Sequence, residues 1–249
     1  MDETEDLLDL APYFAGRRLV TPHTWAEDVY PAIHDFCASR LRRGRSYNLH
    51  LHAHTSIAVA VGYQLDAKAS IDAAPIQGST SGSRLWDPTL PSAHPASAPL
   101  MFTEDRLKSD GAEVAVGLSV TNDVRADVGE YAGQALPGVG RIIWAAMTPK
   151  PSTTAVVDGA HAQALAEQLR EYLRSNRAAD ERRAVLHLFI AAPNGLAYFL
   201  GQLLRGLGPC ILYEYDLEGN TPGGYAPSLA FPPPAPSAGT ATQSAREKE

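Results

Sequence analysis

Residues 186–201 read LHLFIAAPNGLAYFLG, and this stretch decides the fold. An apolar run that ends in a proline-containing turn precedes residues with helical spacing, which predicts a buried strand, a tight turn and a helix. A similar stretch, LHLHAHTSIAVAVG, occupies residues 49–62. Small residues four apart on a helix let it lie close to a sheet, as in nucleotide-binding strand–turn–helix units. Both stretches carry such a pair, Ala58 with Gly62 and Ala197 with Gly201.

The repeated stretch predicts two related α/β halves, residues 1–110 and 111–231, unless the likeness arose by chance. Strand-like and helical patterns alternate on both sides of each copy. The expected strands are 46–52, about 70–77, 113–120, 141–147, 184–192, 210–217 and 225–231. The expected helices begin near residues 25, 55, 122, 159 and 194. Strands that are apolar almost throughout and alternate with helices predict an α/β fold with mostly parallel sheets, flanked by helices on both faces.

Two segments lack a regular pattern. Residues 78–110 are rich in Gly, Ser and Pro, which predicts a long irregular loop pinned to the body by Leu85, Trp86 and Met101. Residues 232–249 combine prolines with small polar residues that offer little to bury, so we expect a flexible tail there.

The composition limits the class of partner. The 249 residues contain 21 Lys and Arg against 28 Asp and Glu, a net charge of −7, which argues against a broad basic surface for long nucleic acids. A small anionic ligand in one pocket is still compatible with this charge. No apolar run approaches the roughly 20 residues of a membrane span, and acidic residues follow Met1 where a secretory signal would be basic. These features predict a soluble, cytoplasmic protein that does not bind a membrane.

Residues with catalytic or metal-binding chemistry are few. No Gly-x-Ser-x-Gly elbow, Walker loop or paired-histidine zinc motif occurs in the sequence. Two cysteines far apart, Cys37 and Cys210, suit neither a disulfide scaffold nor a zinc site. His50, His52 and His54 alternate along an expected strand without a nearby carboxylate or thiol, so we expect one or two of them to line a pocket. We therefore predict neither catalytic residues nor a metal or cofactor, and binding in place of chemistry.

Helix starts are the candidate binding sites. In open α/β sheets, ligands bind beyond the carboxyl ends of the strands, where helix N-termini offer N–H groups to an anion. The candidate starts are residues 53–57, 120–124 and 192–196. In the last of these, Asn194 and Gly195 follow a proline, a pattern that an ordinary helix cap explains equally well.

Several motifs together carry a family resemblance. HLFIAAPNGLAYFLGQLL is followed by CILYEYDL and YAPSLAF, and VGLSVTNDVRADVGEY and HLHAHTSIAVAVGYQL precede it. With these motifs the chain resembles the SAVED domain from about residue 6 to residue 231. SAVED domains resemble two fused CARF-like Rossmann units that sense cyclic oligonucleotides of bacterial antiviral systems, either CBASS or CRISPR type III. The usual fused effector does not fit in residues 1–24, so the resemblance implies a separate effector protein and head-to-tail oligomers formed on ligand binding.

The resemblance also implies a ligand and a set of contacts. The ligand expected is a cyclic tri- or tetranucleotide of the adenylate type, bound in a pocket that both halves share. Backbone N–H groups near Asn194 and Gly195 are expected to hold a phosphate, while Gln77 and Trp86 contact or stack on bases. The full set of expected ligand-binding residues is Gln77, Trp86, Ser119, Thr121, Asn122, Pro193, Asn194, Gly195, Tyr215, His54 and Ser56.

Two other functions remain open at this point. The chain could cleave its ligand, as a ring nuclease does, with residues such as His54 or Asp216. It could also be a structural interaction module, with the long loop and the tail as docking segments.

Overall fold

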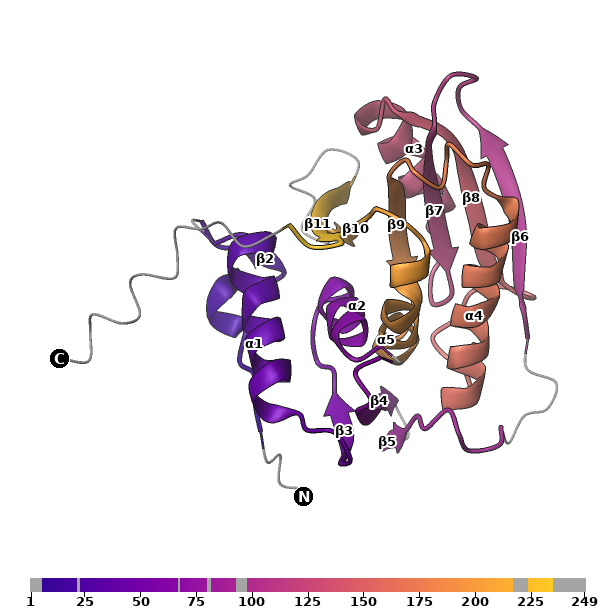
Figure 1. Ribbon diagram of the computed structural model, residues 1–249. Helices are drawn as coiled ribbons and strands as arrows, with labels where there is room; N and C mark the ends of the chain where they lie inside the picture. Colours follow the sequence, from indigo (N-terminus) through magenta and orange to yellow (C-terminus); the bar gives the residue numbers. More distant parts are fainter. Residues whose placement is uncertain are drawn as a thin grey trace.

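The largest sheet of the described residues has six strands (Figure 1). The structure is a computed structural model, and it describes residues 6–21, 23–66, 68–79, 82–92, 98–216 and 224–234. In spatial order the strands are β11 Tyr225–Phe231, β10 Cys210–Tyr215, β9 Leu186–Ala191, β7 Glu113–Ser119, β8 Val139–Met147 and β6 Leu100–Arg106. The four inner strands are parallel, and the edge strands β11 and β6 run antiparallel to them. The predicted α/β fold with a mostly parallel sheet is confirmed.

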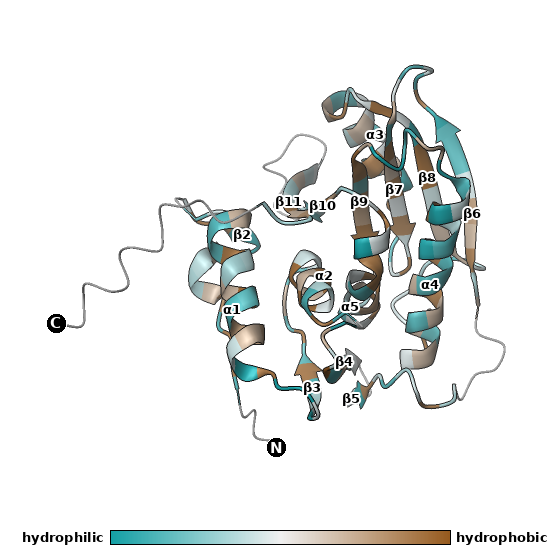
Figure 2. Cartoon of the chain, in the orientation of Figure 1, coloured by the Kyte–Doolittle hydropathy of each residue, from teal (hydrophilic) through white to brown (hydrophobic). Residues whose placement is uncertain are grey.

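Helices cover both faces of this sheet. Helix α3, Arg125–Ala135, covers one face, and α4, Gly159–Asn176, and α5, Asn194–Leu203, cover the other. On β9, Leu188 belongs to the core under α4 and α5, whereas Phe189 belongs to the core under α3. Figure 2 shows the inner strands as brown along most of their length. The inner strands are apolar on both sides because helices cover both faces of the sheet.

A three-stranded sheet belongs to the N-terminal part of the chain. Its order is β3-β4-β5, with β3 at Ser46–His50, β4 at Asp72–Ser79 and β5 at Gly82–Leu85. The first two strands are parallel, and β5 returns antiparallel to β4. The two predicted halves therefore share a strand–turn–helix unit but differ in size, since only the second builds a large sheet.

Two helices from the first part of the chain and several short elements complete the fold of the described residues. A π-helical turn at Trp25–Val29 leads into α1, Tyr30–Arg40, and the side chain of Thr24 caps the turn by accepting the N–H of Glu27 at 3.0 Å. Helix α2, Thr55–Gln64, follows β3. The shorter elements are a 3-10 turn at Ala11–Tyr13, β1 at Phe14–Ala15, β2 at Arg18–Leu19 and a 3-10 turn at Leu204–Gly206.

The predicted irregular loop over residues 78–110 is wrong in part. It contains β5 and also β6, which pairs with β8 from Leu100 opposite Met147 to Arg106 opposite Arg141. Strand β6 therefore belongs to the large sheet, although the sequence placed residue 100 in the first half. The strand escaped notice because it is an edge strand whose second half is exposed and charged. Residues 80, 81 and 93–97 of this loop, and 235–249 of the expected tail, lie outside the described residues.

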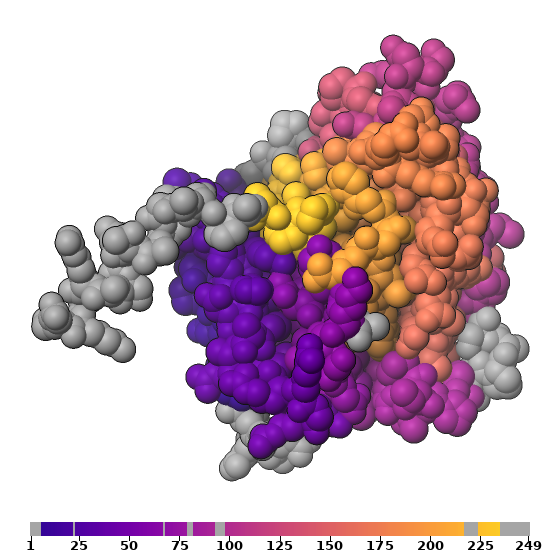
Figure 3. Space-filling model, in the orientation of Figure 1, coloured from indigo at the N-terminus to yellow at the C-terminus, as the bar shows by residue number. Residues whose placement is uncertain are grey.

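Helices α2 and α5 pack side by side between α1 and the large sheet (Figure 1). Side chains from α1, α2, α4 and α5 join one apolar core with the strands beneath them. In the space-filling view, the indigo and violet N-terminal surface adjoins the orange and yellow C-terminal surface without a break (Figure 3). The two halves thus form one body. Over the described residues, no helix is both long and apolar enough to span a membrane.

Candidate functional site

The starts of α2 and α5 lie beside each other. The side-chain amide of Asn194, the first residue of α5, donates hydrogen bonds of 2.8 Å to the carbonyl oxygens of Leu51 and Ala53. These two carbonyls belong to the turn between β3 and α2. Both hydrogens of the Asn194 side-chain amide therefore bond to the first half. These bonds hold the start of α5 next to the start of α2.

The two starts have nearly the same backbone conformation. His54, which precedes α2, has φ −57° and ψ 150°, and Pro193, which precedes α5, has φ −59° and ψ 145°. Neither residue caps its helix with its own side chain. Instead, a side chain from the other half accepts the N–H of the second helical residue. The N–H of Gly195 donates to Gln77 at 3.1 Å, and that of Ser56 donates to Glu214 at 2.6 Å.

A cavity of about 340 Å³ opens at the start of α5. The residues that line it come from the carboxyl ends of β3 and β4 and from α5: Leu51, His52, Ala53, Ile76, Gln77, Gly78 and Asn194. The first half thus supplies most of the wall and the second half supplies a helix start. The positive end of the helix dipole and polar side chains suit an anionic group.

Arg84 carries a positive charge on the strand that pairs with β4. It lies directly opposite Gln77 across the antiparallel pair of β4 and β5, and it is exposed. Residues directly opposite in an antiparallel pair project from the same face of the sheet. Arg84 and Gln77 therefore project from the same face of the small sheet.

The start of α2 is closed by a buried carboxylate. The side chain of Glu214 on β10 is 11% exposed, with Arg17 Nη2 at 3.6 Å and His54 Nδ1 at 3.5 Å from its Oε2 atom. The His54 contact has the distance of an ion pair without the geometry of a hydrogen bond. Burial favours a higher pKa for Glu214, but the contacts from His54 and Ser56 outweigh it and hold the pKa below its ordinary value. The ring of Phe14 stacks on His54 at 4.7 Å and covers this side.

The structure brings part of the predicted site together. Gln77 and Asn194 line the cavity, and Pro193 and Gly195 form the helix start beside it. His54 and Ser56 lie at the neighbouring helix start, around Glu214. These six predicted residues lie around the two neighbouring helix starts.

The other predicted residues lie apart from the cavity. Trp86 is only 5% exposed, and its ring packs against Gly195, where an added Cβ atom would lie 2.5 Å from the ring carbon Cε3. The indole is thus mostly buried beside the start of α5, and the stacking of a base on Trp86 stays a prediction. Tyr215 lies at the end of β10 and packs edge-on against Tyr225, with ring centroids 5.1 Å apart.

The predicted polar residues at the end of β7 contact neighbouring groups of the chain. Ser119 is buried and accepts the N–H of Val124 at 3.1 Å. The N–H of Thr121 donates to the carbonyl of Ala191, and the Asn122 amide approaches the Thr121 hydroxyl at 3.4 Å. None of these three side chains lines the cavity.

Sequence reasoning missed three residues of this region, His52, Arg84 and Glu214. His52 was expected only as one of three histidines, and the structure places it in the cavity wall, with its ring stacked on His50 at 6.3 Å. Arg84 was hidden in the segment taken for an irregular loop. Glu214 belongs to the LYEYD motif, and the available signal was a carboxylate between two tyrosines on an expected strand. Within the described residues, no three ligating side chains gather into a metal site.

A comparison with protein families identifies the family of this chain. The SAVED model, described as the SMODS-associated and fused to various effectors sensor domain, matches residues 29–231. The chain belongs to the SAVED family. A curated relative, CD-NTase-associated protein 4 of Enterobacter hormaechei, is 30% identical over 225 residues. That match covers 90% of this chain and 44% of the relative, so the chain spans less than half of that protein's length.

Solved structures share the fold of this SAVED chain. The Acinetobacter baumannii Cap4 SAVED/CARF-domain containing receptor with the cyclic trinucleotide 2'3'3'-cAAA superposes with a TM-score of 0.59 at 18% identity, over 81% of this chain and 41% of that one. The Moraxella osloensis Cap4 receptor gives a TM-score of 0.59 at 17% identity, over 92% and 48%. At these identities the comparison establishes the fold, and the ligand of this chain has to be argued from its own site.

Proposed function

We propose that this SAVED chain senses a cyclic oligonucleotide of three or four nucleotides, of the adenylate type, in bacterial antiviral defence. The observation that carries the proposal is the cavity at the start of α5, because residues of both halves meet there around a helix N-terminus. The cyclic trinucleotide named with the Acinetobacter receptor supports the class of ligand.

The geometry supports a phosphate beside Gly195. Its N–H donates a hydrogen bond to the neutral side chain of Gln77. A phosphate oxygen can take the place of the Gln77 oxygen and accept a stronger, charge-assisted hydrogen bond. Arg84 lies on the same sheet face and compensates the added negative charge. A volume of 340 Å³ is at the low end of the roughly 300–1,000 Å³ of ligand pockets, so the cavity holds one unit of the ring while the rest lies over its rim.

The response to the ligand follows from the shared pocket. A ligand that contacts both helix starts favours one arrangement of the two halves over others. In the proposed mechanism, this arrangement promotes head-to-tail association of subunits in the cytoplasm and switches a separate effector protein. No cofactor takes part.

Isothermal titration with cyclic di-, tri- and tetranucleotides tests the proposal. We expect an adenine-containing tri- or tetranucleotide to bind, and Gln77→Glu to weaken that binding at least tenfold because it places a carboxylate on the phosphate position. Gln134→Glu, an exposed change on α3, is the matched control. The absence of binding by every ring at tens of micromolar would overturn the proposal.

Cleavage of the ligand is not favoured by the site. His54, one of the two residues considered for it, is 8% exposed and covered by Phe14. After hours of incubation with the protein, the bound ring should be recovered intact by chromatography.

A further inference from the structure

Two equivalent helix starts carry different caps. Ser56 and Gly195 are each the second residue of a helix. The residues that precede these two helices, His54 and Pro193, have nearly identical φ and ψ. The N–H groups of Ser56 and Gly195 are each held by a side chain from the other half, but one partner is a charged carboxylate and the other is a neutral amide. Glutamate and glutamine are nearly equal in size, so charge is the main difference between the two positions.

We propose that Glu214 is a built-in anion that fills the second of two equivalent phosphate positions, so that a ligand phosphate binds at the start of α5 and is excluded from the start of α2. The inference rests on the proposed function and adds a specificity-determining residue to it.

The contacts of Glu214 are those expected of an anion bound at a helix start. One carboxylate oxygen accepts the N–H of Ser56 at 2.6 Å, at the positive end of the dipole of α2. The hydroxyl of Ser56 lies 2.6 Å from that of Ser228, which donates to the carbonyl of Leu212. This backbone conformation therefore already holds an anion once within the molecule.

Further contacts hold the Glu214 carboxylate at the start of α2, so that a phosphate does not readily replace it. Arg17 and His54 lie on its other oxygen, and Phe14 covers His54 from outside. Its lowered pKa keeps the side chain ionised at neutral pH. A second phosphate would have to displace this carboxylate from Arg17 and Ser56 or remain close to it in a poorly solvated place, and like charges repel strongly there.

The start of α5 differs on each of these points. Gln77 carries no charge, its hydrogen bond to Gly195 is longer, and it lines a cavity of about 340 Å³. A larger cavity of about 880 Å³ lies on the side of Arg17 and His54, but neither Glu214 nor Ser56 lines it. An incoming phosphate therefore meets a replaceable cap at this start and a fixed anion at the other. A cyclic ligand would consequently bind asymmetrically, with one phosphate on α5, although the protein that surrounds it is built from two similar units.

Backbone amide chemical shifts during a titration with inorganic phosphate test the inference directly. In the unmodified protein, the Gly195 amide should shift with added phosphate and the Ser56 amide should not. In Glu214→Gln, which gives α2 the same type of cap as α5, both amides should shift. Glu214→Ala frees the same N–H by removing the side chain and should also make Ser56 respond.

The outcomes separate this inference from the proposed function. A phosphate response of Ser56 in the unmodified protein, or none in a folded Glu214→Gln or Glu214→Ala variant, overturns the role of Glu214. If Gly195 fails to respond to phosphate and no cyclic nucleotide binds, the proposed function fails, while a new response of Ser56 in the variants would still identify Glu214 as an internal anion. If neither variant folds, the phosphate titration of the unmodified protein decides. A shift of the Gly195 amide without a shift of the Ser56 amide supports phosphate binding at α5 alone, and equal shifts of both amides contradict it.

Discussion

Gly62 of α2 and Gly201 of α5 lie against each other, and each faces a backbone carbonyl of the opposite helix. A methyl group added to Gly62 would overlap the carbonyl oxygen of Tyr198, and one added to Gly201 would overlap that of Val59. Val59 precedes Gly62 by the same number of residues as Tyr198 precedes Gly201, so the contact is reciprocal. Such reciprocity is typical of the isologous interface of a two-fold dimer, and here it occurs inside one chain.

Alanine at either glycine should destabilise the protein. Because the atoms in the way are backbone and cannot rotate aside, we expect Gly62→Ala or Gly201→Ala to lower the free energy of unfolding by about 1–3 kcal/mol or more, measured by urea denaturation. Gly133→Ala on α3 is the control, since nothing lies within 4 Å of an added Cβ atom there. It should raise stability by about 0.5–1 kcal/mol, as alanine favours a helix over glycine. Equal effects of all three changes would contradict the close crossing.

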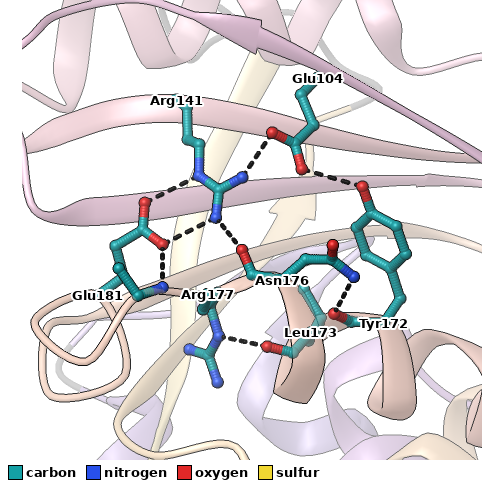
Figure 4. A network of polar contacts seen from close by, with 8 residues as sticks. Glu104, Arg141, Tyr172, Leu173, Asn176, Arg177 and Glu181 are labelled. Atoms are coloured by element: carbon teal, nitrogen blue, oxygen red, sulfur yellow. Dashed lines mark hydrogen bonds and ion pairs between the residues drawn. The ribbon is translucent and has the colours of Figure 1, made fainter.

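A second prediction concerns the network around Arg141 (Figure 4). Arg141 on β8 donates two hydrogen bonds to Glu181, of 2.8 and 2.7 Å, and a further one to Glu104 on β6. Its side chain is 12% exposed and that of Glu181 is 15% exposed, so the pair is mostly screened from water. Arg141→Met should lower stability by about 2 kcal/mol, between the values for exposed and for fully buried pairs.

The matched change for Arg141 is Arg174→Met. Arg174 pairs with Glu171 on the surface of α4, with both side chains more than half exposed, and its loss should cost no more than about 0.5 kcal/mol. Both variants are compared in the same urea series. Similar losses for the two would mean that the Arg141 network contributes no more than an ordinary surface pair.

A third prediction concerns pH and His187. The Nε2 atom of this buried histidine lies 3.2 Å from the carboxylate of Glu113, and its Nδ1 atom lies 2.8 Å from the hydroxyl of Tyr213. A carboxylate accepts, so Nε2 carries the proton and Nδ1 accepts from Tyr213. Burial lowers the pKa of His187, and the hydrogen bond to Glu113 only partly opposes this. The neutral ring is therefore the stable form in the folded protein.

The consequence for stability has a definite sign. A histidine with a lowered pKa binds its proton more readily in the unfolded chain, so its contribution is complete above about pH 6.5 and is lost as the pH falls below that value. The urea midpoint of the unmodified protein should decrease between pH 7.5 and 5.5, and more steeply than that of His187→Gln. His34→Gln, at an exposed position, should keep the original slope. A slope in His187→Gln that matches the unmodified protein would assign the pH dependence to other groups.

The sequence predicted most elements because their patterns are local. The helix over 159–176 and the strand over 225–231 match the observed bounds, since each has a clear apolar pattern and defined ends. The repeat found in residues 49–62 and 186–201 corresponds to the two helices that cross at Gly62 and Gly201. Edge strand β6 was missed because half of it faces solvent, where no apolar alternation is required.

The candidate site was less predictable because it depends on contacts between the halves. Gln77, Asn194 and Gly195 were expected from strand ends and the proline turn, and they do lie together. Trp86 looked like a ligand contact because it is an aromatic residue in a polar segment, yet its ring fills the space beside a glycine. Nothing local in the sequence indicates that Glu214 reaches Ser56, since the two are far apart in the chain and meet only in the folded protein.

A last prediction concerns Arg84 and the ionic strength. If its guanidinium contacts a ligand phosphate beside Gln77, Arg84→Gln should weaken binding of the cyclic nucleotide about tenfold and reduce the slope of log K against log salt by about 1. Arg106→Gln, an exposed change on β6 at the opposite end of the strands, alters the net charge equally and should leave both affinity and slope unchanged. The measurement is a series of calorimetric titrations at several salt concentrations. A uniform loss in both variants would indicate an effect of the net charge alone, whereas a change confined to Arg84→Gln places the phosphate at the carboxyl end of β4, within reach of the start of α5.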